Sequence, residues 1–156
     1  MARRRRAEKR VIPPDTRYNN VVVAKFINRL MWNGKKTTAQ RIFYSAMNQI
    51  ENEIHRAPVE VFEQALRNAT PLVEVKSRRV GGATYPIPSE VRGERGTALG
   101  MKWLIVAARA KTGKPMSERL AQEITDASRG QGVAVKRRED LHRMAESNRA
   151  FAHYKW

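Results

Sequence analysis

Few residues of this chain have the types and spacing that catalysis requires. The sequence contains no cysteine, and its 3 histidines are scattered at His55, His142 and His153. The separation between His142 and His153 is not one at which metal ligands pair. His142 is followed one helical turn later by Glu146, but a single His–Glu pair on a helix is more often structural or exposed than catalytic. The sequence therefore predicts no metal site, no cofactor and no enzymatic activity.

Two Gly-Lys dipeptides raise the question of a phosphate-binding loop of the nucleotide-hydrolase type. Gly34-Lys35 lacks the upstream glycine of that motif, because position 29 is arginine, and Gly113-Lys114 is followed by Pro115 where the motif has Ser or Thr. Neither dipeptide forms such a loop. Lys35 and Lys36 nevertheless precede an expected helix, and a cationic loop at a helix N-terminus suits one phosphate group. The alternative is a glycine-terminated helix followed by solvated lysines.

Positive charge is the dominant chemical feature of the chain. Lys and Arg total 31 against 15 Asp and Glu, which gives a net charge of +16. Such an imbalance makes a compact domain repel itself, so a polyanionic partner is expected, first nucleic acid and second an anionic membrane. The basic N-terminus is not followed by an apolar segment, and the longest apolar run, Leu104–Ala108, is far too short to span a membrane. We therefore expect a soluble, non-secreted protein with no membrane partner.

The clearest local signal is the segment 73–88, which predicts a β-hairpin. Gly81-Gly82 suits the positive φ angles of a two-residue turn, and both flanking runs contain β-branched residues. This turn places Pro86 opposite Ser77 and Pro88 opposite Val75, at non-hydrogen-bonded positions where their missing N–H groups cost the ladder nothing.

The same pairing sets the positions of the hairpin's charged side chains. Because strand side chains alternate, Lys76, Arg78 and Tyr85 share one face and Arg79 lies on the other. A two-stranded ribbon is marginally stable alone, so we expect a scaffold at its base and a polyanion along its length. The alternative is an ordinary surface hairpin with solvated charges.

The rest of the chain has helical periodicity, with apolar residues at three- and four-residue spacing. The fold class expected is mainly α, a bundle of six helices with the hairpin protruding between the third and the fourth. We expect a basic arm over residues 1–12 and a single helical RNA-binding domain over residues 13–156, with an aromatic basic tail at 151–156. The expected helices run from Val22 to a stop at Asn33-Gly34, from a Thr37 or Thr38 cap to Ile54, from Pro58 to Pro71, around Met101 to Ala108, from a Ser117 cap to Gly130, and from Val133 to Ala150. Residues 93–96 are expected to form a loop, and Leu141, Met144 and Ala145 to face inward.

Three functional classes remain open at this point. The leading hypothesis is a structural RNA-binding protein, because the cations form a wide footprint rather than one recognition helix, and folded RNA offers more shape than duplex DNA. The second is an architectural protein that uses the ribbon on DNA, and the third, an RNA-modifying enzyme, has no catalytic constellation to support it. Tyr85, Tyr154 and Trp156 lie beside cations and suit stacking on unpaired bases. The alternative for each is ordinary packing or a cation–π contact.

Several motifs together resemble the family of bacterial small ribosomal subunit protein seven. They are Ser77-Arg-Arg-Val-Gly-Gly-Ala83, Gly34-Lys-Lys followed by Ile42-Phe43 and Ala46, the opening residues 1–8, and the ending Asn148-Arg-Ala-Phe-Ala-His-Tyr-Lys-Trp156. The resemblance runs from the first residue to the last. One departure is Pro86, where relatives are expected to carry a polar residue such as Gln; the pairing above makes the proline harmless to the ladder.

The resemblance implies a structural constituent of the small ribosomal subunit, in the cytoplasm. It implies early binding to ribosomal RNA of the subunit head, nucleation of head assembly, and a place at the subunit interface near exit-site tRNA and mRNA. The implied neighbours are small-subunit proteins nine and eleven, and no homo-oligomer is expected. The residues implied to bind ribosomal RNA are Arg3, Arg4, Arg5, Arg6, Arg10, Lys35, Lys36, Arg41, Lys76, Arg78, Arg79, Lys102, Arg109, Lys111, Lys114, Arg119 and Arg143. Those implied to lie near tRNA and mRNA are Arg78, Arg79, Val80, Gly81, Gly82, Ala83, Tyr85, Arg149, Tyr154 and Trp156.

Overall fold

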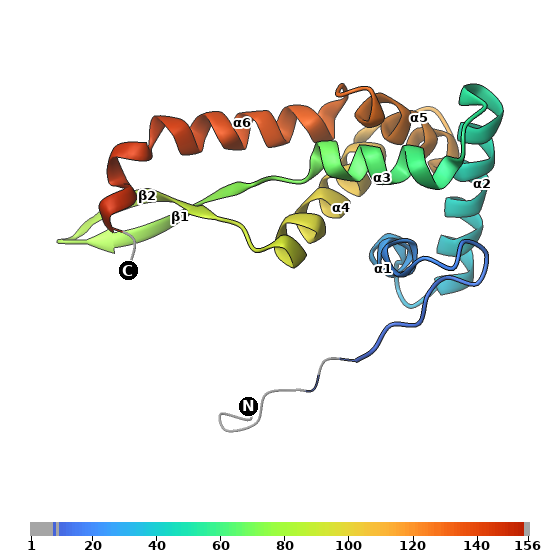
Figure 1. Ribbon diagram of the computed structural model, residues 1–156, viewed down its shortest axis with the longest axis horizontal. Helices are drawn as coiled ribbons and strands as arrows, with labels where there is room; N and C mark the ends of the chain where they lie inside the picture. Colours follow the sequence, from blue (N-terminus) through green and yellow to red (C-terminus); the bar gives the residue numbers. More distant parts are fainter. Residues whose placement is uncertain (1–7, 9, 155–156) are drawn as a thin grey trace.

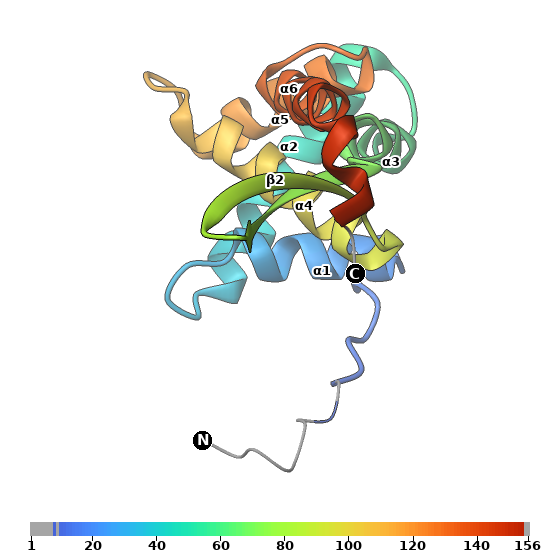
Figure 2. The same ribbon diagram turned by 90° about the vertical axis from the view of Figure 1, so that its left-hand side faces the viewer.

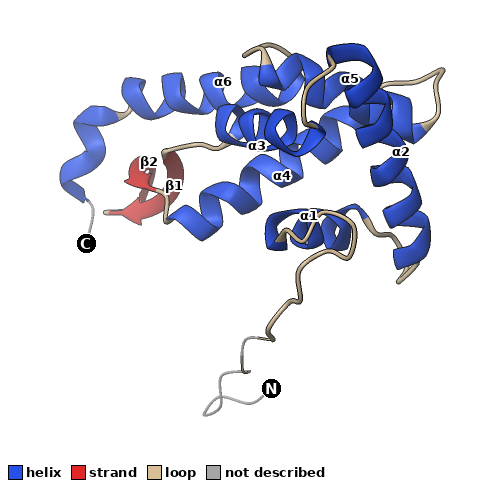
Figure 3. Cartoon of the chain, turned by 45° about the vertical axis from the view of Figure 1, so that its right-hand side comes forward, coloured by secondary structure: helices blue, strands red, loops and turns tan. Residues whose placement is uncertain are grey.

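A computed structural model shows a helical body from which a two-stranded ribbon extends (Figure 1). The structure describes residue 8 and residues 10–154, and the strands of the ribbon are the only ones in that part of the chain (Figure 3). The predicted mainly helical fold, with a hairpin between the third and fourth helices, is confirmed. The elements are α1 (Val21–Leu30), α2 (Lys36–Ile54), α3 (Pro58–Ala69), β1 (Val73–Val80), β2 (Ala83–Glu90), α4 (Gly93–Ala110), α5 (Met116–Ser128), α6 (Val133–Ser147) and a 3₁₀ helix η1 (Arg149–Tyr154). The division at residues 12 and 13 stays a prediction.

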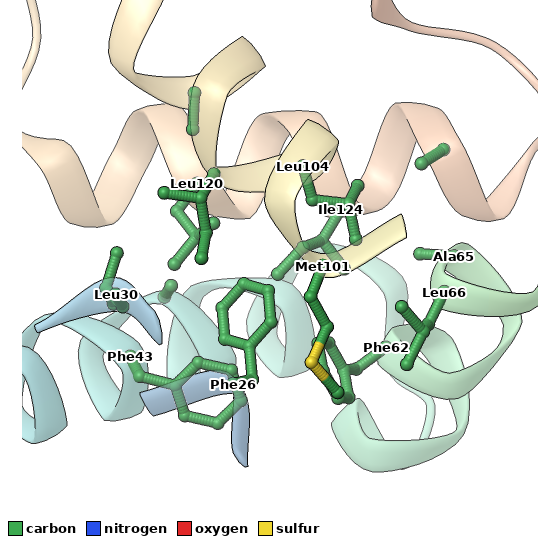
Figure 4. Packing of buried hydrophobic residues seen from close by; sticks show 14 of the residues in the cluster. Phe26, Leu30, Phe43, Phe62, Ala65, Leu66, Met101, Leu104, Leu120 and Ile124 are labelled. Carbon is green, nitrogen blue, oxygen red and sulfur yellow. The ribbon is translucent and has the colours of Figure 1, made fainter. Parts of the chain in front are cut away.

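The core is organised around three phenylalanines from α1, α2 and α3. The ring centroids of Phe26 and Phe62 are 5.0 Å apart, and Phe43 lies 5.5 Å from each of them. Figure 4 shows these rings beside Met101 of α4 and below Leu120 of α5. All five side chains are at most 2% exposed. The helical faces predicted from apolar spacing are therefore the faces that pack together.

Two predicted helix caps are wrong. No side chain caps α2 or α5: α2 begins at Lys36, one residue before Thr37, and α5 begins at Met116, one residue before Ser117. Before α2, the Lys35 N–H bonds to the Trp32 carbonyl at 3.0 Å, so the turn itself starts the helix. Before α5, the N-cap position is occupied by Pro115, whose ring has no oxygen that could accept a hydrogen bond from the first turn.

Residues 93–96 are helical, so the loop predicted there is wrong. Two glycines mark the side on which α4 passes the end of α3. A Cβ added to Gly96 would lie 3.1 Å from the Pro71 carbonyl oxygen, and one added to Gly100 would lie 3.0 Å from Thr70 Oγ1. These glycines permit close packing of two elements, whereas the sequence predicts a loop at residues 93–96.

The C-terminal segment differs most from expectation. α6 ends at Ser147 instead of Ala150, and Met144, predicted to face inward, is 52% exposed. In Figures 1 and 2, α6 lies on the opposite side of the molecule from α1 and extends along the ribbon, where η1 bends back onto β2. The ribbon therefore projects from the bundle together with the C-terminal helix.

The first helix also ends earlier than predicted. α1 ends at Leu30, a few residues before the predicted stop at Asn33-Gly34.

Candidate nucleic-acid interface

The register of the ribbon is the one the sequence predicts. Gly81 and Gly82 both have positive φ angles, 58° and 90°, and Val80 pairs with Ala83 across them. Pro86 lies opposite Ser77 and Pro88 opposite Val75, and β2 continues to Glu90, two residues beyond the predicted end. The two prolines leave that edge of β2 without donors for a further strand.

At the base of the ribbon a buried carboxylate pairs with two cations, whereas the tip is cationic. Glu74 is 7% exposed and pairs with Lys76 at 2.9 Å and with Arg95 at 2.8 Å. Burial alone would raise the pKa of Glu74, but the hydrogen bonds from Lys76 and Arg95 and their charges outweigh burial and lower it. Nearer the turn, Arg78 and Arg79 are exposed on opposite faces. The tip therefore presents positive charge in two directions.

One face of the ribbon is braced by the C-terminus. The Tyr85 ring packs against Phe151 of η1, with centroids 5.3 Å apart and planes inclined by 43°. Ile87, on the same face as Tyr85, is 2% exposed. The half-buried Tyr85 thus has a packing role, which reduces the ring surface left for the predicted base stacking. Arg149 is exposed and lies 3.4 Å from Glu146.

His142 joins α6 to the start of the ribbon. Its Nε2 accepts a hydrogen bond from the Leu72 backbone N–H at 3.1 Å. Burial, aided by the charge of Arg138, lowers the pKa of His142 and keeps the ring neutral, as an acceptor must be. This histidine has the structural role that the sequence favoured.

A second group of cations meets where the α1–α2 turn approaches the α4–α5 turn. The Arg109 guanidinium lies 5.3 Å from the centre of the Trp32 ring and donates to the Leu30 carbonyl at 3.2 Å. Arg119 donates to the carbonyl oxygens of Arg109 and Lys111, and so fixes the end of α4. Lys35 lines the same hollow as Arg109 and Arg119. Three of the predicted RNA-binding residues, Lys35, Arg109 and Arg119, thus lie around one hollow, although they come from separate parts of the chain.

The N-terminus of α2 has an unfavourable arrangement of charge. Lys35 and Lys36 are exposed there, and the first turn of α2 contains no acidic residue. Positive side chains at the positive end of a helix dipole repel it, and a bound phosphate relieves that repulsion.

Lys111 differs from the other predicted RNA-binding residues. Its ammonium group lies 3.0 Å from Glu123, which is fully buried, and 3.5 Å from Asp126. Glu123 also accepts the Ala134 N–H at 3.0 Å, which joins α5 to the start of α6. Lys111 therefore neutralises a buried carboxylate, whereas Lys114 nearby is exposed.

A third group joins the predicted Arg10 to two cations that the sequence analysis missed, Lys25 and Arg29. Arg10 lines a hollow of about 670 Å³ together with Lys25 and Arg29 of α1 and Glu94 of α4. Arg29 donates to the Ala98 carbonyl at 3.2 Å. Lys25 and Arg29 are exposed and one helical turn apart, so their spacing on the polar face of α1 contained the signal.

The remaining candidates are more dispersed. Arg41, Lys102 and Arg143 are exposed on α2, α4 and α6, and no contact joins them to the groups above among the described residues. Tyr154 ends η1. The predicted residues Arg3, Arg4, Arg5, Arg6 and Trp156 lie outside the described residues.

Other kinds of site were searched within residue 8 and residues 10–154. That range contains no cluster of three or more residues of the types that hold a metal ion. None of its helices combines the length and apolarity needed to cross a membrane.

The fold and the cation groups indicate a class of protein first: they are typical of a helical nucleic-acid-binding protein, with basic surfaces spread over several elements. The chain matches the family model for Ribosomal protein S7p/S5e over residues 2–149, and it belongs to that family. It is 57% identical to "Small ribosomal subunit protein uS7" of Thermotoga maritima over 154 residues, 99% of each chain. The same protein of Chloroflexus aggregans is 57% identical over 99% of this chain and 98% of its own. That of Dehalococcoides mccartyi is 56% identical over 156 residues, the whole of both chains.

Membership confirms the resemblance drawn from the sequence motifs. The family is one of structural ribosomal proteins, so the prediction that the chain is not an enzyme is also confirmed.

Proposed function

We propose that this protein binds ribosomal RNA in the head of the small ribosomal subunit and nucleates the folding of that RNA. The coarser part follows from the family: the chain is a structural constituent of the small subunit, associated with its RNA, and acts in the cytoplasm as part of the ribosome. The finer part, the head domain and early binding, is what the resemblance of the sequence motifs implies, and the arrangement of the cations is compatible with it.

The observation that carries the proposal is the spread of exposed cations over separate surfaces. One set lies around the α1–α2 turn and the α4–α5 turn, a second beside Arg10 and α1, and a third at the ribbon tip. A surface of this kind contacts several RNA segments at once and holds them in a fixed relation. Contacts to phosphates at many points favour a folded RNA over a linear duplex.

We further propose that the ribbon tip lies near exit-site tRNA and mRNA, with small-subunit proteins nine and eleven as neighbours. The tip extends away from the bundle, and Arg78 and Arg79 expose charge on both of its faces. Neither arginine is needed for the core, so both remain available to a transient ligand.

The first experiment measures binding of the full chain to a transcript of the head domain of small-subunit ribosomal RNA. Affinity should exceed that for random duplex DNA by orders of magnitude and should fall steeply with salt, because several phosphates are neutralised together. Equal affinity for heparin, duplex DNA and the transcript would overturn the proposal of specific RNA binding.

The second experiment separates the roles of the ribbon and the bundle. Arg78→Ala combined with Arg79→Ala should impair translation while small subunits still assemble. Arg56→Ala is the control, since Arg56 is 69% exposed and follows α2, whose 19 residues separate it from Lys35 by roughly 28 Å. Loss of assembled subunits in the double variant would show that the ribbon anchors RNA instead.

A further inference from the structure

The hollow between α1, α2, α4 and α5 has the composition of a ligand site. Its volume is about 520 Å³, which lies within the roughly 300–1,000 Å³ typical of small-molecule sites. Leu30, Ile42 and Met116 form apolar parts of its lining, and Lys35, Arg109 and Arg119 add positive charge. None of the described residues that line it is acidic. The hollow therefore suits a ligand with an apolar body and a negative charge.

Trp32 is the residue that distinguishes this hollow from an ordinary surface depression. It lines the hollow and is 73% exposed, the same exposure as Leu72 and far more than the 8% of Trp103 in the core. Exposing a large aromatic ring to water makes the unbound protein less stable. The ring is also held in place, because the Arg109 guanidinium lies over it at 5.3 Å and is itself fixed by the Leu30 carbonyl.

We propose that this hollow holds one unpaired nucleobase of an RNA strand, stacked on Trp32, with the adjoining phosphates bound by Lys35 and Arg109. Aromatic rings such as indole, and guanidinium planes, are side-chain surfaces on which single-stranded bases stack. The base supplies the apolar body and the phosphates supply the negative charge that the lining requires. The Thr38 hydroxyl, which also lines the hollow, is a neutral group suited to the edge of a base. The inference rests on the proposed RNA-binding function and adds to it one specific nucleotide site.

The charge of the lining favours RNA over a second candidate occupant, a basic segment of a neighbouring protein. The α2 N-terminus adds the positive end of its dipole beside Lys35, with no acidic residue in its first turn. A basic protein segment would be repelled by this environment, whereas a nucleotide phosphate is stabilised by it.

The test compares Trp32→Ala, Trp32→Phe and Leu72→Ala in the full chain, with the head-domain transcript as the probe. Trp32→Ala should weaken binding by about 5- to 150-fold, the range that loss of one base–aromatic stack corresponds to. Trp32→Phe should recover most of that loss because it keeps an aromatic face. Leu72→Ala removes an equally exposed apolar side chain outside the hollow and should bind like the wild type.

Salt dependence provides a readout that a loss of folding would not mimic. Trp32→Ala should leave the slope of log affinity against log salt unchanged, since no phosphate contact is removed. Lys35→Ala should make the slope shallower by about 0.7–0.9, the change expected for one phosphate. Chemical probing of the transcript should show a base that becomes reactive in the Trp32→Ala complex and stays protected with Leu72→Ala.

The outcomes separate this inference from the function on which it rests. If the wild type fails to bind the transcript selectively, the proposed function fails. If the wild type binds and Trp32→Ala matches Leu72→Ala in affinity and in base protection, only the nucleotide site is overturned. The nucleotide site is also overturned if Trp32→Ala loses RNA affinity only when a second ribosomal protein is added.

Discussion

Replacing Lys111 with methionine should destabilise the fold while leaving the surface for RNA almost unchanged. Its ammonium group is 3.0 Å from Glu123, whose side chain is fully buried between α5 and the start of α6. Methionine keeps most of the volume of the lysine but removes the charge. Glu123 would then be a buried carboxylate without its cation, although the Ala134 N–H would still donate to it.

The magnitude follows from the burial of the two partners. Removing one member of a buried ion pair costs about 3–5 kcal/mol. We expect the lower end, about 3 kcal/mol, because the Lys111 side chain is 24% exposed and water reaches its ammonium group. For a chain of this size that loss corresponds to a fall in Tm of about 6–12 °C.

Urea unfolding followed by circular dichroism measures the effect, with RNA affinity determined at a temperature where the variant is folded. Lys114→Met is the matched control, since Lys114 is exposed and its replacement should change stability by at most about 0.5 kcal/mol. Adding Glu123→Gln to Lys111→Met should recover most of the lost stability, because glutamine still accepts the Ala134 N–H without a buried charge. A stable Lys111→Met variant with weakened RNA binding and a shallower salt slope would refute this reasoning and restore Lys111 to the RNA-binding surface.

Three further predictions concern the ribbon and the packing of α4. Phe151→Ala removes the ring that Tyr85 packs against, so hydrogen exchange of the ribbon amides should accelerate while global stability falls by only about 1 kcal/mol. The pKa of Glu74 is lowered in the folded state, so its contribution to stability is present above the pKa of an ordinary glutamate and is lost as the pH falls from there through the lowered value. Glu74→Gln should therefore flatten the acid side of the stability curve, and an unchanged curve would contradict the pairing. Gly100→Ala places a Cβ 3.0 Å from Thr70 Oγ1 and should destabilise by about 1 kcal/mol in urea unfolding, whereas Gly93→Ala, which meets nothing within 4 Å, should not.

Features set by neighbouring residues were predictable from the sequence. The Gly81-Gly82 turn fixes the ribbon register by itself, and the positions of the prolines in β2 agree with that register. The apolar faces of the helices follow from the spacing of their apolar residues, because residues three or four apart lie on the same side of a helix and are buried together. Cap positions were less predictable, since a backbone turn starts α2 where two threonines offered a side-chain cap.

Features that depend on distant parts of the chain were missed. Nothing local to Phe151 indicates that its ring meets Tyr85, and nothing local to Lys111 indicates a buried carboxylate on the next helix. The glycines of α4 look like loop residues until the end of α3 is known to pass beside them. The same limit applies to Trp32, whose partner Arg109 comes from the far end of α4. Sequence identified which residues were cationic, and the fold determined which of them are occupied by internal partners.

The contact between Phe151 and Tyr85 has a thermodynamic consequence for any ligand at the ribbon tip. A free two-stranded ribbon samples many orientations, and a ligand that selects one of them loses affinity to the entropy of ordering the rest. Here α6 and η1 lie against the ribbon and hold it before any ligand arrives. The ordering cost is thus incurred during folding, so even a ligand that makes few contacts at the tip can bind and leave quickly without a prior rearrangement of the ribbon.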